Sequence, residues 1–371
     1  MGRSFDVISA PIVPAHIYEG TNYRDNPVNR KPIGTGPFKF DEWKSGEYIH
    51  LLRNDDYYLD GLPHLDDIYY RFIPGSASRE VAIETGLVQL ATQNDVELVD
   101  IPRLKAKPDL IVTTKGYEWA APICWMEMNL RRKPFDDVRF RRAVMYALDR
   151  KFIRDNIFFG LAKVATGPIH SSSPFYTDDV PHYSRNLEKA KALLDEMGLK
   201  PDEDGVRVKI GLLGLPYGEV WARLSQYIKQ ALGDVGVQVR LEPADVAGWG
   251  NRFANWDFDM VITYLTTLTD PALGVARTFI TENQRKGVLF TNTSGYSNPK
   301  VDHLFAEAAS TPNSDKRTKL YHEVQEILTS DVAVGWLVEL EWPTIYSAKL
   351  KNVVPNAFGV NDNFAEVYFE K

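Results

Sequence analysis

A strand–helix–strand pattern in the middle of the chain constrains its fold most strongly. Residues 206–213 (VRVKIGLL) and 237–242 (VQVRLE) are short runs rich in β-branched residues, and residues 221–232 between them have the apolar spacing of a helix. Strands joined through a helix run parallel in one sheet, because a tight turn joins only antiparallel strands. The pattern therefore predicts the α/β fold class.

Similar patterns cover the rest of the 371 residues and predict two lobes. Further strands are predicted at 38–43, 48–53, 68–73, 110–114, 123–130, 258–264, 334–340 and 344–346. Helices are predicted at 78–89, after the capping pair Asp136 and Asp137, after the capping residues Asn186 and Asn298, and from Ser314. Since the regular alternation starts near residue 122, we expect residues 122–341 to form one lobe. Residues 1–121 form the other lobe with a C-terminal return, residues 342–371, and a ligand cleft is expected between the lobes.

Composition excludes several classes of function. The net charge of −7 argues against binding to the phosphate backbone of a nucleic acid. No apolar run approaches the roughly 20 residues that span a bilayer, and no secretory signal is recognisable in the chain as given. The single cysteine, Cys124, leaves no internal disulfide and no cysteine-based metal site.

Residues 30–40 (RKPIGTGPFKF) contain two glycines that could indicate a phosphate-binding loop. Such a loop needs free backbone N–H groups at a helix N-terminus and a Lys-Ser/Thr pair after the glycines. Here Pro37 removes one N–H donor and a strand follows. We therefore interpret Gly34 and Gly36 as a structural corner, in which glycine permits conformations that are closed to other residues.

The sequence carries no recognisable catalytic or metal-binding signature. None of its seven histidines has HExxH spacing, and there is no GxSxG motif. His170 lies beside Ser171, but catalysis requires proximity in space rather than in sequence, so this pair is interpreted as part of a loop. We expect no catalytic residue, no metal and no cofactor, and hence a protein that is not an enzyme.

Several segments resemble the family 5 extracellular solute-binding proteins, the dipeptide-, oligopeptide- and nickel-binding receptors of bacterial ABC importers. Residues 29–43 (NRKPIGTGPFKFDEW), followed by 48–58, resemble the family's G-T-G-P block. Residues 83–90 (IETGLVQL) are similar to its G-E-V-D segment, and 129–150 (NLRRKPFDDVRFRRAVMYALDR) to its P-F-D-D-V-R block. Two shorter segments continue the resemblance in the same order along the chain, at residues 295–302 (GYSNPKVD) and 316–328 (KRTKLYHEVQEIL).

The resemblance implies a two-lobed, periplasmic-binding-protein-like α/β fold of type II, cluster C. Two lobes would close on a peptide or peptide-like small molecule and then dock on an ABC permease of the inner membrane. It also implies a monomer in the periplasm, or a lipid-anchored extracellular protein, with no nucleic-acid partner. Family members carry more residues before the matched region, so we expect an N-terminally truncated fold in which residues 1–20 are the tail of a missing small domain.

Other functions stay open on the sequence alone. A hydrolase that acts on the same ligands would share the scaffold. A receptor for an oligosaccharide or an opine-like solute, or a signalling co-receptor, would share it as well. The scaffold does not decide between them, because the side chains that contact a ligand vary independently of the fold.

The resemblance places candidate ligand residues after the strand predicted at 258–264. In peptide-binding members this strand brings an aromatic residue and then an acid to the ligand, and Tyr264 stands at the aromatic position. Thr267 stands where those members have the aspartate that binds the peptide ammonium, with Thr266 and Asp270 near it. A hydroxyl forms hydrogen bonds but no ion pair, so an ordinary free-amine peptide is in doubt. Alternatively, Thr267 is simply a β-branched strand residue.

The strand predicted at 123–130 resembles another ligand-binding strand of the family. Trp125 would stack on the ligand, Glu127 would meet a positive or hydroxyl-rich group, and Asn129 follows on the same strand. A buried carboxylate without a partner is costly, so Glu127 should have a ligand or an arginine beside it. Candidates for binding an anionic end of the ligand are Arg277, Arg285 and Lys286, each with a solvated surface charge as the alternative.

Overall fold

The computed structural model describes residues 12–23, 25–268 and 270–370 of the chain. These residues form two compact units. One unit, Glu118–Glu341, is continuous, and the other combines the chain up to Tyr117 with the segment from Trp342 onwards. The expectations for residues 1–20 fall largely on residues 1–11, outside the described part. No helix in the described ranges combines the length and the apolarity that crossing a membrane requires.

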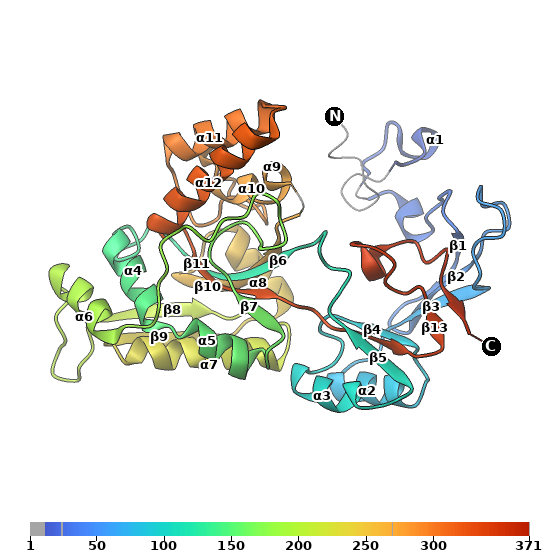
Figure 1. Ribbon diagram of the computed structural model, residues 1–371, viewed down its shortest axis with the longest axis horizontal. Helices are drawn as coiled ribbons and strands as arrows, with labels where there is room; N and C mark the ends of the chain where they lie inside the picture. Colours follow the sequence, from blue (N-terminus) through green and yellow to red (C-terminus); the bar gives the residue numbers. More distant parts are fainter. Residues whose placement is uncertain (1–11, 24, 269, 371) are drawn as a thin grey trace. The chain divides into compact units, whose positions relative to one another are not determined.

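The continuous unit is built on a six-stranded mixed sheet (Figure 1). Its strands, in spatial order, are β7 (Ala162–Val164), β11 (Gly335–Leu340), β6 (Pro122–Met128), β10 (Met260–Thr266), β8 (Val208–Leu213) and β9 (Val237–Glu242). β8 and β9 are parallel and are joined through α7 (Glu219–Gly233), which confirms the predicted strand–helix–strand unit. β6 lies inside the sheet and is buried along its whole length, as expected of a strand covered on both faces.

Different layers cover the two faces of this sheet. On one face the ring of Tyr264 in β10 stacks on Trp221 of α7. On the other face, an apolar core that includes Ile123, Trp125 and Leu265 packs against α11 (Pro299–Ser310) and α12 (Ser314–Ser330). Figure 1 shows α11 and α12 on the opposite side of the sheet from α7. Smaller helices complete the unit: α4 (Val138–Ala147), α5 (Arg150–Phe152), α6 (Leu187–Glu196), α8 (Val246–Ala254), α9 (Pro271–Gly274) and α10 (Ala276–Phe279).

Polar side chains fix the starts of the main helices. Asp137 precedes α4 and accepts a hydrogen bond from the Arg139 N–H at 2.8 Å. Asn186, Asn298 and Asn313 cap α6, α11 and α12 in the same way. Each side-chain oxygen satisfies an N–H group that has no partner inside the helix. The predicted starts of these four helices are confirmed.

The other unit contains two three-stranded antiparallel sheets. β1 (Phe38–Lys44), β2 (Tyr48–Arg53) and β3 (Asp67–Arg71) form the first, and β1 and β2 pair as the predicted hairpin. In the second, β12 (Thr344–Ser347) pairs with both β4 (Leu90–Thr92) and β5 (Leu110–Thr113). The C-terminal segment is thus the central strand of a sheet begun by the early part of the chain. The unit also contains α1 (Ala15–Tyr18), α2 (Ser76–Glu84), α3 (Ile101–Lys105), β13 (Leu350–Lys351) and β14 (Tyr368–Phe369).

Two local predictions are wrong. α2 ends at Glu84 rather than near residue 89, because Gly86 adopts a left-handed φ of 73° and β4 begins four residues later. The corner at residues 30–40 leads into β1 as predicted, but Gly34 and Gly36 do not have the positive φ that would require glycine. A side chain at Gly36 would meet nothing within 4 Å. The helix α8 and the short strand β7 had no clear sequence signal.

Candidate functional site

The register of β6 and β10 orders the predicted ligand residues along the sheet. Thr266 lies opposite Pro122 at one end of this strand pair, and Met260 lies opposite Met128 at the other. The strand rises about 3.3 Å per residue, so these two ends are about 20 Å apart. Thr266 and the predicted ligand residues that follow it in the chain lie at the first end, which is called the Thr266 end below. Asn129 follows Met128 at the opposite end, so the structure divides the predicted set into two groups.

Thr267 is a buried residue at the Thr266 end, with 3% of its surface exposed. Its hydroxyl donates a hydrogen bond to the backbone carbonyl of Ala121 at 2.8 Å, and its N–H donates to the same oxygen at 3.3 Å. The hydroxyl proton is therefore already used within the unit. What remains for a ligand is a neutral acceptor, which lacks the negative charge of the aspartate that the family resemblance predicts at this position.

Asp270 has two structural partners. Its carboxylate caps α9 by accepting a hydrogen bond from the Ala272 N–H at 3.0 Å. It also forms a buried ion pair with the guanidinium of Arg317 in α12, which lies over the rings of Phe175 and Tyr321. The negative charge of Asp270 is thus compensated inside the unit, and this pair ties α9 to α12.

Arg277 differs from Asp270, because its charge has no carboxylate partner. Its Nε donates to the carbonyl of Gly274 at 3.2 Å, and its Nη2 donates to the carbonyl of Thr266 at 3.1 Å. No acidic side chain of the described residues lies within ion-pair distance of this half-buried guanidinium. Burial lowers the pKa of Arg277 below its ordinary value, because water no longer stabilises the charge fully. An anionic group of a ligand would supply the missing partner.

Tyr264 and Trp125 lie on opposite faces of the sheet. In the β6–β10 pair, Tyr264 is opposite Cys124, whereas Trp125 is opposite Thr263. Tyr264 stacks on Trp221 with ring centroids 5.5 Å apart, and burial raises the pKa of its phenol to about 12. Trp125 is buried in the apolar core on the other face. The two rings therefore cannot sandwich one ligand group, although a contact of either ring with a ligand stays a prediction.

Glu127 is a carboxylate with 0% of its surface exposed. It accepts hydrogen bonds from the indole N–H of Trp125 at 3.2 Å and from the hydroxyl of Thr293. Burial raises its pKa to about 7, while these two donors and the nearby charge of Arg131 act in the opposite direction. The expected arginine ion pair is replaced by an indole and a hydroxyl. Glu127 thus joins β6 to residue 293, which lies far along the chain.

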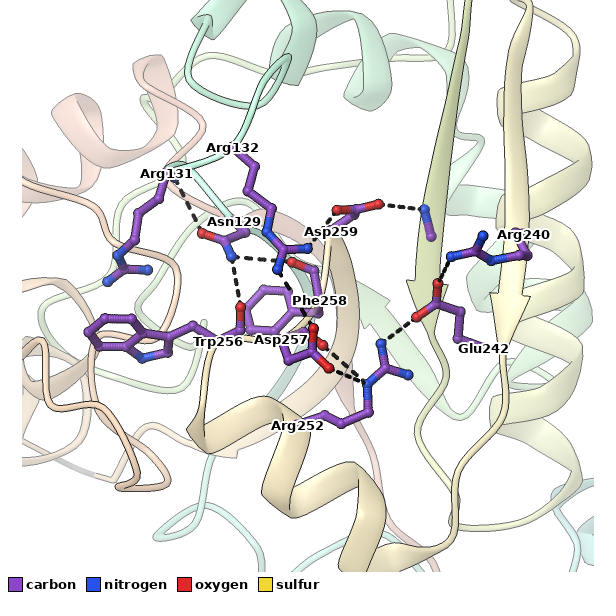
Figure 2. A network of polar contacts seen from close by, with 11 residues as sticks. Asn129, Arg131, Arg132, Arg240, Glu242, Arg252, Trp256, Asp257, Phe258 and Asp259 are labelled. Atoms are coloured by element: carbon purple, nitrogen blue, oxygen red, sulfur yellow. Dashed lines mark hydrogen bonds and ion pairs between the residues drawn. The ribbon is translucent and has the colours of Figure 1, made fainter.

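The side chain of Asn129, at the end of the sheet opposite Thr266, uses both its NH2 group and its oxygen in hydrogen bonds within the unit. Its side-chain NH2 donates to the carbonyls of Trp256 at 3.0 Å and Phe258 at 3.2 Å, and its oxygen accepts from the Arg131 N–H. Figure 2 shows this amide within a polar network that includes the Arg132–Asp259 ion pair at 2.9 Å. Members of the network also include Arg240, Glu242, Arg252 and Asp257, and the Arg131 guanidinium lies over the Trp256 ring. These contacts indicate a brace between β6 and the segment that leads into β10.

Glu339 in β11 is a further buried acid, which was not among the residues predicted from the sequence. It lies opposite Ile123 of β6 and Lys163 of β7, and Ile123 in turn lies opposite Leu265. Glu339 therefore belongs to the row of residues that precedes Thr266. Its oxygens accept hydrogen bonds from the N–H of Ser171 at 2.8 Å and from the Ser171 hydroxyl at 2.5 Å. An acid in the apolar run 334–340 was the signal that could have drawn attention to it.

Ser172, His170 and Glu339 are arranged in the order of a hydrolytic triad. The Ser172 oxygen lies 2.9 Å from His170 Nδ1, and His170 Nε2 lies 3.6 Å from Glu339. A hydrolase also needs N–H donors for the oxyanion that forms on the substrate. In the described loop from Ser171 to Thr177, every backbone N–H already has an acceptor, apart from Pro174, which has none to give. The loop therefore lacks these donors and does not support the hydrolase alternative.

Comparisons with known proteins identify this fold and its family. The oligopeptide-binding protein AppA from Bacillus subtilis, solved with a nonapeptide, has a TM-score of 0.83 and is 26% identical, covering 98% of this chain and 73% of its own. The Helicobacter pylori protein DppA, solved with the peptide STSA, has a TM-score of 0.82 at 24% identity, covering 94% and 65%. These likenesses confirm the predicted α/β class and place the chain with two-lobed periplasmic binding proteins.

The sequence comparisons define the family. The profile of the bacterial extracellular solute-binding proteins, family 5 (middle region), matches residues 4–287. B. subtilis AppA is 29% identical over 343 residues, covering 87% of this chain and 60% of the relative. The glutathione-binding protein GsiB of Salmonella typhimurium is 28% identical over 308 residues, covering 80% and 57%. The chain belongs to the family 5 solute-binding proteins, and it spans about 60% of the length of these curated relatives.

Proposed function

We propose that this chain forms the ligand-capturing part of a solute-binding receptor for an ABC importer. The receptor takes up a peptide or peptide-like small molecule and delivers it to a membrane permease, without catalysing a reaction. Support comes from the family, whose members bind substrates, and from relatives named for binding oligopeptides, glutathione and, in Escherichia coli, D,D-dipeptides. A periplasmic or extracellular location and action as a monomer are parts of the same proposal.

The observation that carries the proposal is the guanidinium of Arg277 at the Thr266 end. It is half-buried and held in place by two backbone carbonyls, and it has no carboxylate partner among the described residues. A cation held in this way matches the carboxylate at the C-terminus of a peptide, because a guanidinium and a carboxylate form two parallel hydrogen bonds. We propose that Arg277 binds that carboxylate, with Thr266 and Thr267 as neighbouring ligand residues.

A pair of peptide pools tests this assignment. One pool has free C-terminal carboxylates, and the other has the same peptides with C-terminal amides. Native mass spectrometry should show that the chain prefers the free-carboxylate pool by about tenfold or more, as expected for a charge-assisted hydrogen bond. Arg277→Gln should remove that preference. Arg223→Gln, which changes an exposed arginine of α7 paired with Glu219, is the matched control and should keep it. Equal binding of both pools by the unaltered chain would contradict the role of Arg277.

A further inference from the structure

Glu339 is a buried acid at the same end of the sheet as the candidate ligand residues. Only 2% of its surface is exposed. Directly opposite residues in an antiparallel pair point to the same face, so Glu339 shares the face of Ile123 and of Leu265 beyond it. That face also carries α10 with Arg277, because Ala276 and Phe279 belong to the same apolar core as Ile123. A carboxylate and an uncompensated guanidinium thus lie on one face at one end of the sheet.

No lysine or arginine of the described residues lies within ion-pair distance of Glu339. Burial raises the pKa of this carboxyl, and the hydrogen bonds from Ser171 and the more distant charge of Lys163 oppose that effect only in part. The nearest basic side chain is His170, whose Nε2 lies 3.6 Å from Oε2, too far for a good hydrogen bond. The backbone N–H of Ser172 donates to His170 Nδ1 at 3.1 Å, so the neutral ring carries its proton on Nε2. Burial lowers the pKa of His170 to about 4, so the ring is uncharged at neutral pH. Lys163 pairs with Glu341 instead, at 3.2 Å.

Two other acids near this end already have cationic partners. Asp270 forms its ion pair with Arg317, and Glu341 forms its ion pair with Lys163. Thr267, at the position where peptide-binding members have an acid, donates its hydroxyl proton to a backbone carbonyl. Unlike these two acids, Glu339 has no lysine or arginine of the described residues within ion-pair distance, so its charge is left for a ligand. A carboxylate accepts about four hydrogen bonds, and Ser171 uses two of those positions.

We propose that Glu339 is the anchor for the positively charged group of the solute, an ammonium in a peptide-like ligand. The proposal rests on the proposed function, because it assigns the second end of the same solute. The ammonium donates hydrogen bonds to the free lone pairs of Glu339 and takes the place of the His170 ring beside Oε2. The ion pair removes the cost of a buried charge without a counter-ion. Glu339 thus supplies the charge that Thr267 cannot supply, and it makes a free amine a requirement of the ligand.

The test compares a pool of synthetic peptides with free amines and the same pool after acetylation of every amine. Native mass spectrometry of the full chain measures the affinity for each pool. The unaltered chain should prefer the free-amine pool by about 10- to 100-fold, the range of a hydrogen bond between charged groups. Glu339→Gln should abolish that preference, whereas Glu339→Asp should keep most of it. Glu188→Gln, which removes an exposed carboxylate of α6, is the control and should behave as the unaltered chain does.

Each outcome has a distinct meaning. An unaltered chain that binds both pools equally well overturns the inference about Glu339 and leaves the proposed function intact. An unaltered chain that binds neither pool overturns the proposed function, and the inference with it. A preference that survives in Glu339→Gln, or that is lost equally in Glu188→Gln, also overturns the inference. If Glu339→Gln fails to fold, as judged by circular dichroism, Glu339→Ala takes its place, and a preference that survives in that folded variant overturns the inference.

Discussion

The protonation of Glu127 gives a quantitative prediction about stability. In the folded unit this carboxylate is completely buried, and its pKa is raised from 4.5 to about 7. Burial outweighs the hydrogen bonds from Trp125 and Thr293, which favour the charged form. Between pH 4.5 and 7 the unfolded chain therefore loses this proton while the folded chain keeps it. Glu127 thus contributes stability below pH 4.5 that is lost as the pH rises through 7.

The magnitude follows from the size of the pKa shift. One pKa unit corresponds to about 1.4 kcal/mol, so the shift of Glu127 amounts to about 3 kcal/mol of unfolding free energy. Glu127→Gln has almost the same shape but no charge, so it lacks this dependence. The unfolding free energy of the variant, measured relative to that of the unaltered chain, should therefore rise by about 3 kcal/mol between pH 4.5 and pH 8. A neutral amide also keeps an acceptor for Trp125 or Thr293.

Hydrogen exchange of peptides from β6 is the suitable assay, because it reports the free energy of opening this unit rather than the other one. The unaltered chain and the variant are compared at the same pH, so the intrinsic effect of pH on exchange cancels. Glu188→Gln, which removes an exposed carboxylate of α6, is the control and should show no such trend. A stability difference between the unaltered chain and Glu127→Gln that is the same at pH 5 and pH 8 would refute the reasoning.

Two further predictions concern the Thr266 end. Gly274→Ala should lower the free energy of unfolding of the continuous unit by about 2 kcal/mol or more, because the new Cβ would lie 1.7 Å from the Thr267 carbonyl oxygen. Thermal denaturation measures the loss of stability. An unchanged melting temperature would show that the contact is wrong. Arg317→Met should lower the free energy of unfolding by about 3–5 kcal/mol, because it leaves Asp270 buried without a counter-ion. In a double-mutant cycle, adding Asp270→Asn should restore part of that stability. Strict additivity of the two changes would contradict the ion pair.

Local patterns in the sequence were sufficient for the elements that build the sheet. The β8–α7–β9 unit could be predicted because alternating strands and an amphipathic helix leave a periodic signal. The helix starts could be predicted because a capping side chain such as Asp137 acts on N–H groups within its own turn. The predicted end of α2 was wrong because the apolar pattern continues beyond Gly86, whereas the left-handed backbone conformation of this glycine ends the helix.

The arrangement of the candidate site could not be predicted, because it depends on contacts between distant parts of the chain. The sequence shows that Trp125 and Tyr264 lie on strands, but the register of β6 against β10 decides that they face opposite sides. The partner of Glu127 is Thr293, on a segment with no sequence signal for that pairing. Glu339 likewise accepts its hydrogen bonds from Ser171, which lies 168 residues earlier in the chain.

Capture of peptides by this chain tests the central claim most directly. The chain is mixed with a pool of short peptides with free termini and examined by native mass spectrometry under conditions that preserve weak complexes. The account predicts complexes of one chain with one peptide that disappear when the chain is unfolded. A chain that is folded by circular dichroism and forms no such complex at millimolar peptide would contradict the proposal that it captures peptide-like solutes.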